Sequence, residues 1–108
     1  MRANEFVKKF GWGWAKDVVN NQPKTDAQIF NPYNQKYSSS YNIKKGVSVA
    51  WLKHFVESHE IVEYIGNDLD GAKQVYAFTK DCVHVAMRDR MIPVIRLKQA
   101  IADVESCQ

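Results

Sequence analysis

The chain has 108 residues, of which 45% are hydrophobic and 25% are charged. This composition is that of a folded protein with enough apolar material for one core, and it excludes general disorder. No run of residues approaches the roughly 18 apolar residues of a membrane span, and the early Glu5 leaves no room for an apolar signal sequence. We therefore predict a single domain over residues 1–108 that does not associate with membranes.

The net charge of +3 is distributed unevenly along the sequence. Residues 1–50 contain eight basic and three acidic side chains, whereas residues 51–108 contain seven basic and nine acidic ones. A basic half can attract nucleic acid or an acidic protein surface. Five excess charges over fifty residues are modest, however, so a solvated surface is the favoured interpretation.

Apolar periodicity predicts a first helix over residues 4–20. Apolar side chains recur at every fourth position from Phe6 to Val18, which places them on one helical face. Gly11 and Gly13 interrupt this face. They either divide the segment into two short helices or admit a close approach of another backbone.

Two further amphipathic helices are predicted, over residues 49–65 and 94–106. Ser48 is a suitable N-cap for the first of them, and Gly66 is a suitable C-cap. Pro93 suits the first turn of the second. Both segments carry a continuous apolar stripe, so helices are expected to dominate the fold.

Residues 74–87 fit two alternatives. The β-branched and aromatic residues over 75–79 and 83–87, separated by Lys80-Asp81, could form a hairpin, but a helix can also be drawn from Leu69 to Thr79. The favoured interpretation is a short helix followed by a small antiparallel hairpin. The predicted fold class is thus α+β, a mostly helical domain with three amphipathic helices and a small antiparallel β element.

Residues 21–46 form a long connecting segment that is rich in Tyr, Ser and Asn. It exceeds the usual connection of about 4–6 residues, and such loops are commonly functional or contain short strands. The strand-like pieces are residues 28–30 and 41–43, which could pair with each other.

Three tyrosines recur at every fourth position within this segment. Tyr supplies a large contact area with few torsions to freeze, and neighbouring Ser and Asn supply adaptable hydrogen bonds. This composition is typical of a contact surface. The predicted partner-binding residues are the three tyrosines and the polar and basic side chains between and after them: Tyr33, Tyr37, Tyr41, Asn34, Lys36, Lys44 and Lys45.

A protein is the favoured partner for this segment, and nucleic acid is the alternative. Tyrosine rings could stack on bases while Lys36, Lys44 and Lys45 neutralise phosphates. The sequence contains no RNP motif, zinc finger or basic helix, which argues against nucleic acid. A third alternative is that the tyrosines simply pack on the domain. Composition leaves the oligomeric state open.

Acidic residues suggest a second, weaker surface. Glu57, Glu60 and Glu63 recur on one predicted helix, and Asp68 and Asp70 follow it. Such residues could form an acidic patch for a basic partner or a pair of acid–base groups. Exposed helix faces routinely look like this, and no catalytic motif accompanies them.

No metal site, cofactor or enzymatic activity is predicted. His54 and His59 are five residues apart on a helix and point about 140° away from each other, whereas His59 and Glu63 have ligand spacing but lack a third ligand. Cys82 and His84 would share a face of a strand, but a structural cysteine is the commoner case. Cys82 and Cys107 are expected to be free thiols of an intracellular protein.

Three stretches, residues 4–12, 52–63 and 97–107, resemble small accessory proteins encoded in the early regions of lambda-like phages and prophages. They cover about a third of the chain. The resemblance implies a bacterial cytoplasmic setting, no catalytic residues, and stoichiometric binding to a host protein. An anti-defence inhibitor, such as an anti-CRISPR protein, is a specific form of that function.

Overall fold

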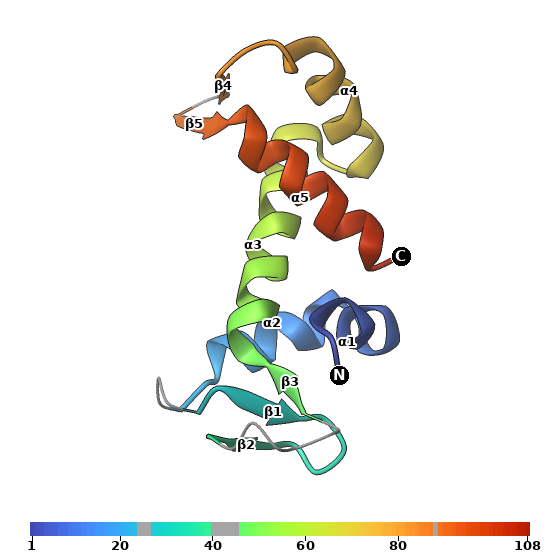
Figure 1. Cartoon of the computed structure of the whole chain (residues 1–108), viewed down its shortest axis with the longest axis vertical. Coiled ribbons are helices and arrows are strands. Elements are labelled where there is room, and N and C mark those ends of the chain that lie inside the picture. The colour runs from blue at the N-terminus through green and yellow to red at the C-terminus, as the bar shows by residue number, and fades with distance from the viewer. Residues whose placement is uncertain (24–26, 40–45, 88) are drawn as a thin grey trace. The chain divides into compact units, whose positions relative to one another are not determined.

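The computed structural model describes residues 1–23, 27–39, 46–87 and 89–108. Over these residues it contains five helices, a three-stranded antiparallel sheet and a two-stranded antiparallel sheet (Figure 1). This confirms the predicted α+β class. None of the described helices is long and apolar enough to cross a membrane.

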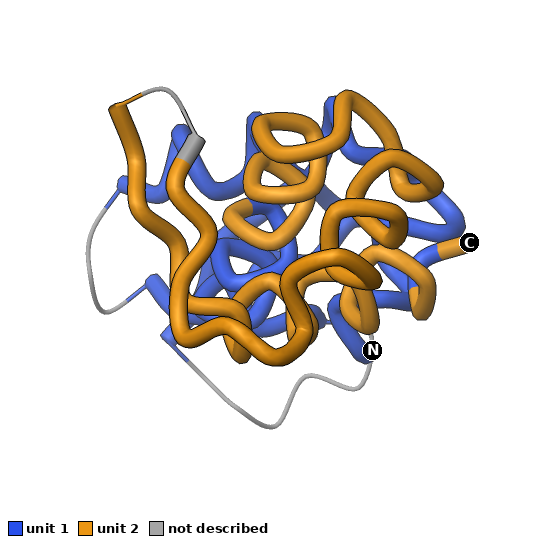
Figure 2. The backbone as a smooth tube through the Cα atoms, turned by 90° about the horizontal axis from the view of Figure 1, so that it is seen from above, with its two compact units in different colours: residues 1–56, 107 blue, residues 57–106, 108 orange. Residues whose placement is uncertain are grey.

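The chain divides into two compact units (Figure 2). Unit 1 comprises residues 1–56 with Cys107, and unit 2 comprises residues 57–106 with Gln108. The boundary between the units falls within one helix, α3, which spans Val49–Gly66. The expectation of a single domain stays a prediction.

Unit 1 begins with two short helices, α1 (Ala3–Phe10) and α2 (Trp12–Asn20). Gly11 separates them because its φ of +90° lies where a side chain is strained. Its N–H donates to the carbonyl of Val7 at 2.8 Å and so ends α1. Of the two alternatives for residues 4–20, the pair of short helices is therefore the one observed.

The sheet of unit 1 has the order β2-β1-β3. Strand β1 (Ile29–Asn31) lies in the middle, between β2 (Lys36–Ser38) and β3 (Val47–Ser48), and Phe30 is paired with Tyr37 on one side and Val47 on the other. The strand predicted at residues 28–30 is thus found, shifted by one residue. The strand predicted at 41–43 lies outside the described residues, and the partners of β1 are β2 and β3.

Aromatic rings dominate the core of unit 1. The Phe6 ring lies 5.0 Å from that of Phe10, 5.4 Å from that of Trp14 and 6.4 Å from that of Phe30. These spacings and tilted orientations are those that aromatic pairs prefer. The cluster joins α1, α2 and the sheet, with Leu52 of α3 fully buried in it.

Unit 2 contains the second half of α3, followed by α4 (Leu69–Thr79), the hairpin of β4 (His84–Met87) and β5 (Arg90–Pro93), and α5 (Val94–Ser106). Helix α3 confirms the helix predicted over 49–65, and α5 confirms the one predicted over 94–106. The hairpin pairs Val85 with Ile92, which are both buried.

A close backbone contact forms the corner between α3 and α4. A Cβ atom on Gly66 would lie 2.0 Å from the backbone nitrogen of Ala72, and one on Gly71 would lie 1.9 Å from the carbonyl oxygen of Gly66. Neither position can hold a side chain without a shift of the backbone. Asp68 completes the corner as the N-cap of α4, since its carboxylate accepts from the Gly71 N–H at 2.7 Å.

Of the two alternatives for residues 74–87, the helix from Leu69 to Thr79 is the one observed, and a small antiparallel hairpin follows it, so a first strand at residues 75–79 is not found. Residues 75–79 belong to α4, and the partner of residues 84–87 is residues 90–93. The Asp68 cap and the glycine corner start a helix, and this local context outweighs the strand preference of the aromatic and β-branched residues. Pro93 correspondingly ends β5, and the last helix begins at Val94.

Candidate interaction surfaces

The β1–β2 turn in unit 1 brings together part of the predicted tyrosine surface. The Asn31 side chain accepts from the Tyr33 N–H at 2.9 Å, and the Asn34 side chain accepts from the Lys36 N–H at 3.0 Å. These bonds are typical of Asn in tight turns, and Gln35 adopts a left-handed φ of +56°. Asn34 thus shapes the turn on which Tyr33 and Lys36 are displayed.

Tyr33 is 53% exposed, but it is not loosely held. The Lys9 ammonium donates to the Tyr33 hydroxyl at 2.9 Å and lies 5.1 Å from the centre of its ring. The Tyr33 ring also meets Phe10 edge-on, with centroids 6.2 Å apart. Tyr33 therefore offers one anchored, exposed aromatic face beside a cation.

Tyr37 has a packing role. Its ring lies 4.9 Å from that of Phe30, and its hydroxyl donates to the carbonyl of Val18, one of the last carbonyls of α2. Such carbonyls have no partner within their own helix, so the bond ties β2 to α2. Burial raises the pKa of the Tyr37 phenol above its ordinary value.

The remaining predicted binding residues, Tyr41, Lys44 and Lys45, lie outside the described residues. Among those described, Tyr33, Asn34 and Lys36 lie at the turn, whereas Tyr37 is half-buried in the packing of unit 1. The fourfold spacing of Tyr33 and Tyr37 therefore does not produce a row of equally exposed rings, because one lies in a turn and the other in a strand.

Two arginines line the same pocket as two of the predicted acidic residues of unit 2. A pocket of 320 Å³ is lined by Glu57, Glu60, Ile61, Arg90 and Arg96. The carboxylates on this face thus have cations beside them. Of the other predicted acidic groups, Glu63 lies 3.2 Å from His59, Asp68 caps α4, and Asp70 lies in the first turn of α4.

The histidines and cysteines are spread over several elements, and Cys82 lies outside the strand that His84 begins. Cys82 is exposed just before β4, His84 begins β4, and Cys107 is buried in the core of unit 1. The His54 ring lies between Trp51 and Phe55, with centroids 5.8 Å and 5.9 Å away. Within the described ranges no three His, Cys, Asp or Glu side chains come close enough together to hold a metal ion.

Sequence reasoning missed a group of exposed apolar side chains in unit 2. Phe78 is 89% exposed, Ile95 79%, Val83 76% and Met91 66%. Single exposed apolar residues are normal, but four large ones in a unit of about fifty residues call for a physical explanation. Ile95 gave a signal that could have been used, because it lies beside the apolar stripe of its helix and not on it.

Two of these residues line a pocket of 330 Å³, which we call the α4–α5 pocket. The pocket lies between the end of α4, the segment before β4 and the first turns of α5. The carbonyl of Val83 accepts from the Val94 N–H at 2.9 Å and so joins two of its walls. Its lining residues are Tyr76, Lys80, Cys82, Val83, Val94, Ile95 and Lys98.

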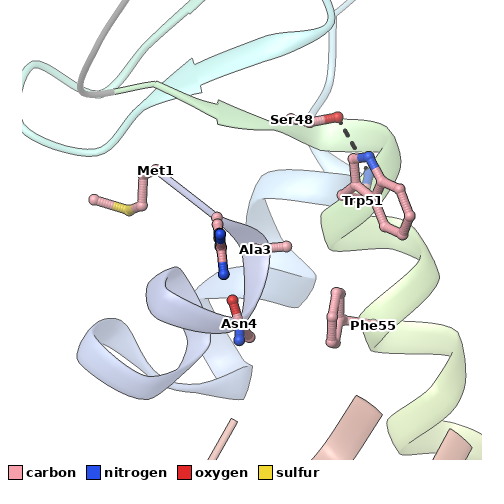
Figure 3. A pocket seen from close by; sticks show the side chains of 7 residues that line it. Met1, Ala3, Asn4, Ser48, Trp51 and Phe55 are labelled. Atoms are coloured by element: carbon pink, nitrogen blue, oxygen red, sulfur yellow. Dashed lines mark hydrogen bonds between the residues drawn. The ribbon is translucent and has the colours of Figure 1, made fainter. Parts of the chain in front are cut away.

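Unit 1 has a pocket of its own, of 370 Å³ (Figure 3). Trp51 and Phe55 project from successive turns of α3, and residues around the start of α1 form the opposite side, including Met1 and Asn4. Ser48 accepts from the Trp51 N–H at 3.3 Å, as its predicted role of N-cap requires. Trp51 is the exposed aromatic residue of this site.

Comparison with models of protein families, with curated proteins and with solved structures gave no match.

Proposed function

We propose that this chain is a non-catalytic protein-binding module whose principal contact surface is the exposed apolar group of unit 2. The observation that supports the proposal is the exposure of Phe78, Val83, Met91 and Ile95. Exposure of these side chains to water is unfavourable, so a partner that covered them would gain free energy from the burial.

The size of the group matches the demands of association. Burial of one large apolar side chain contributes about 1.5–3 kcal/mol, whereas association costs about 4–15 kcal/mol in lost freedom of movement. One such side chain is therefore too few for stable binding. Burial of several of the four exposed apolar side chains that the structure describes in unit 2 would contribute an amount within that range.

Charge argues against nucleic acid as the partner of unit 2. Its residues contain nine acidic and six basic side chains. The α3–α4 corner has a helix–turn–helix outline, but Asp68 and Asp70 stand at the start of α4. Phosphates would meet like charge there, because the start of the second helix is the part that enters the DNA groove in such motifs.

Nucleic-acid binding by unit 1 is the second candidate function. Residues 1–56 carry nine basic and three acidic side chains. Tyr33, held by Lys9 and followed by Lys36, offers a ring for stacking next to cations. This candidate requires an affinity that falls steeply with salt.

The physiological form that we propose is a stoichiometric modulator or inhibitor of a bacterial host protein, acting in the cytoplasm. It rests on the resemblance of residues 4–12, 52–63 and 97–107 to phage accessory proteins. The exposed apolar group supports a binding role independently of that resemblance.

Affinity capture with surface variants tests the proposal. The immobilised chain is incubated with bacterial extract, and retained proteins are quantified for the wild type, for the double variant Phe78→Ser/Ile95→Ser, and for the matched control Tyr33→Ser. We expect a protein that is retained by the wild type and by the control but lost from the double variant. Retention by the double variant together with loss from Tyr33→Ser would instead assign binding to unit 1.

A further inference from the structure

The α4–α5 pocket carries a more specific inference than the exposed apolar group as a whole. We propose that it receives an acidic peptide segment, in which a large apolar side chain enters the pocket and flanking carboxylates meet Lys80 and Lys98. This inference rests on the proposed protein-binding function and specifies the chemistry of the partner.

The walls and the rim of the pocket differ in character. Val83, Val94 and Ile95 supply its apolar surface, and the volume of 330 Å³ lies at the lower end of the range for ligand-binding clefts. Lys80, which follows the last residue of α4, and Lys98, in α5, are both exposed and line this pocket. Among the described residues that line the pocket there is no acidic side chain, although the exposed Asp81 lies between Lys80 and Cys82 in the sequence.

The two lysines are available to a partner. Within the part of the chain that the structure describes, neither takes part in an ion pair, whereas Lys73 on α4 is bound to Glu105 at 2.9 Å. A positive rim around an apolar pocket is unexpected in a unit whose acidic side chains outnumber its basic ones. Charge complementarity therefore favours carboxylates on the partner.

The same rim disfavours a symmetric dimer through this pocket. In a twofold interface the same patch of both copies meets, so Lys80 and Lys98 of both copies would be brought into one interface. Like charges brought together and partly desolvated cost free energy. An acidic partner neutralises them instead.

Selection from a random library of 12-residue peptides tests the proposal without knowledge of the partner. We expect the wild type to enrich peptides in which Asp or Glu flanks a large apolar residue. We expect Lys80→Glu/Lys98→Glu to lose this acidic preference and Ile95→Ser to enrich no such peptides. The control Lys8→Glu/Lys53→Glu, which changes the net charge equally at exposed sites of unit 1, should select as the wild type does.

The affinity for one selected peptide provides the quantitative readout. Two exposed ion pairs predict that Lys80→Glu/Lys98→Glu weakens binding by roughly tenfold or more at low salt, and that added salt reduces this difference. Wild-type selection without acidic enrichment, or an unchanged preference in the double lysine variant, would overturn the inference.

The outcomes also separate the inference from the proposed function. Enriched apolar peptides without acidic flanks that are lost in Ile95→Ser would refute the acidic partner and retain the protein-binding surface. A dimer in analytical ultracentrifugation that Ile95→Ser dissociates would overturn the inference and assign the pocket to a second copy. Failure to enrich any peptide would also count against it, whereas the capture experiment decides the proposed function independently.

Discussion

The Ser58 hydroxyl donates to the Asp103 carboxylate at 2.6 Å in the interior of unit 2. Ser58 is fully buried and Asp103 nearly so. Arg96 donates to the Ser58 oxygen through both terminal nitrogens at 3.1 Å, and Gln99 donates to the other Asp103 oxygen at 2.8 Å. This polar network links α3 to α5 and so fixes the helix that bears Ile95 and Lys98.

Removal of the Ser58 hydroxyl should destabilise the fold. Ser58→Ala takes a donor from buried Asp103 and an acceptor from Arg96, so we expect the free energy of unfolding to fall by about 2–3 kcal/mol. Urea unfolding followed by circular dichroism measures the change. Ser106→Ala, which removes a bond to the Asp103 carbonyl at the end of α5, serves as the milder control at about 0.5–1.5 kcal/mol. A Ser58→Ala effect no larger than that of the control would show that the network contributes little.

Glycine-to-alanine substitutions at the α3–α4 corner and in α2 are predicted to have effects of opposite sign. Gly66→Ala places a Cβ against the backbone of Ala72, and we expect it to destabilise the chain by about 3 kcal/mol or more, as other overpacking substitutions can. In Gly13→Ala the added Cβ meets no atom within 4 Å apart from its chain neighbours and the backbone of α2, and the variant should stabilise by about 0.5–1 kcal/mol through helix propensity. Thermal unfolding of both variants compares them directly. Equal effects would refute the close contact at the corner.

Tyr37 should link stability to alkaline pH. Its pKa is raised by burial, so the folded state retains the phenolic proton more strongly than the unfolded state does. The stabilisation is therefore complete below the unfolded pKa of about 10 and is lost as pH rises through the folded pKa. Stability measured from pH 8 to pH 11 should decline less steeply in Tyr37→Phe than in the wild type. Tyr33→Phe is the exposed control, and an identical decline in Tyr37→Phe and the wild type would contradict the assignment.

The salt dependence of the affinity distinguishes nucleic-acid binding by unit 1 from protein binding. For the proposed protein-binding function we expect labelled DNA and RNA to bind no more tightly than about 10⁻⁴ to 10⁻⁶ M, the range of non-specific association. Fluorescence anisotropy at about 50 mM and 200 mM salt measures the affinity and its salt dependence. Tight binding that weakens steeply with salt and is reduced by Lys9→Ala would favour the nucleic-acid alternative.

The helices were predictable because their signals are local. Ser48 caps α3, an apolar stripe runs through α5, and Gly11 separates α1 from α2. The alternative strand at residues 75–79 is not found because its outcome depends on a contact between Gly66 and Gly71, which fixes the direction of α4. Strand preference in residues 75–79 carries no information about that corner.

The candidate surface was less predictable than the fold. Apolar periodicity predicts which side chains are buried in the core. It does not predict which apolar side chains stay exposed to solvent, as Ile95 and Phe78 do. Tyr37 illustrates the converse, because a residue type that is common in binding surfaces is here bonded to the end of α2. Tyr33 and Lys36 are exposed, and their role in partner binding stays a prediction.

The most direct test of the protein-binding surface is the dissociation constant of the captured partner for Phe78→Ser/Ile95→Ser, measured by calorimetry beside Tyr33→Ser. Each variant must first show a free energy of unfolding within about 0.5 kcal/mol of the wild type, as exposed substitutions usually do. Loss of two buried apolar contacts predicts at least a hundredfold weaker binding for the double variant, from about 1.5 kcal/mol per side chain, and little change for Tyr33→Ser. An unchanged dissociation constant in the double variant would contradict the proposal.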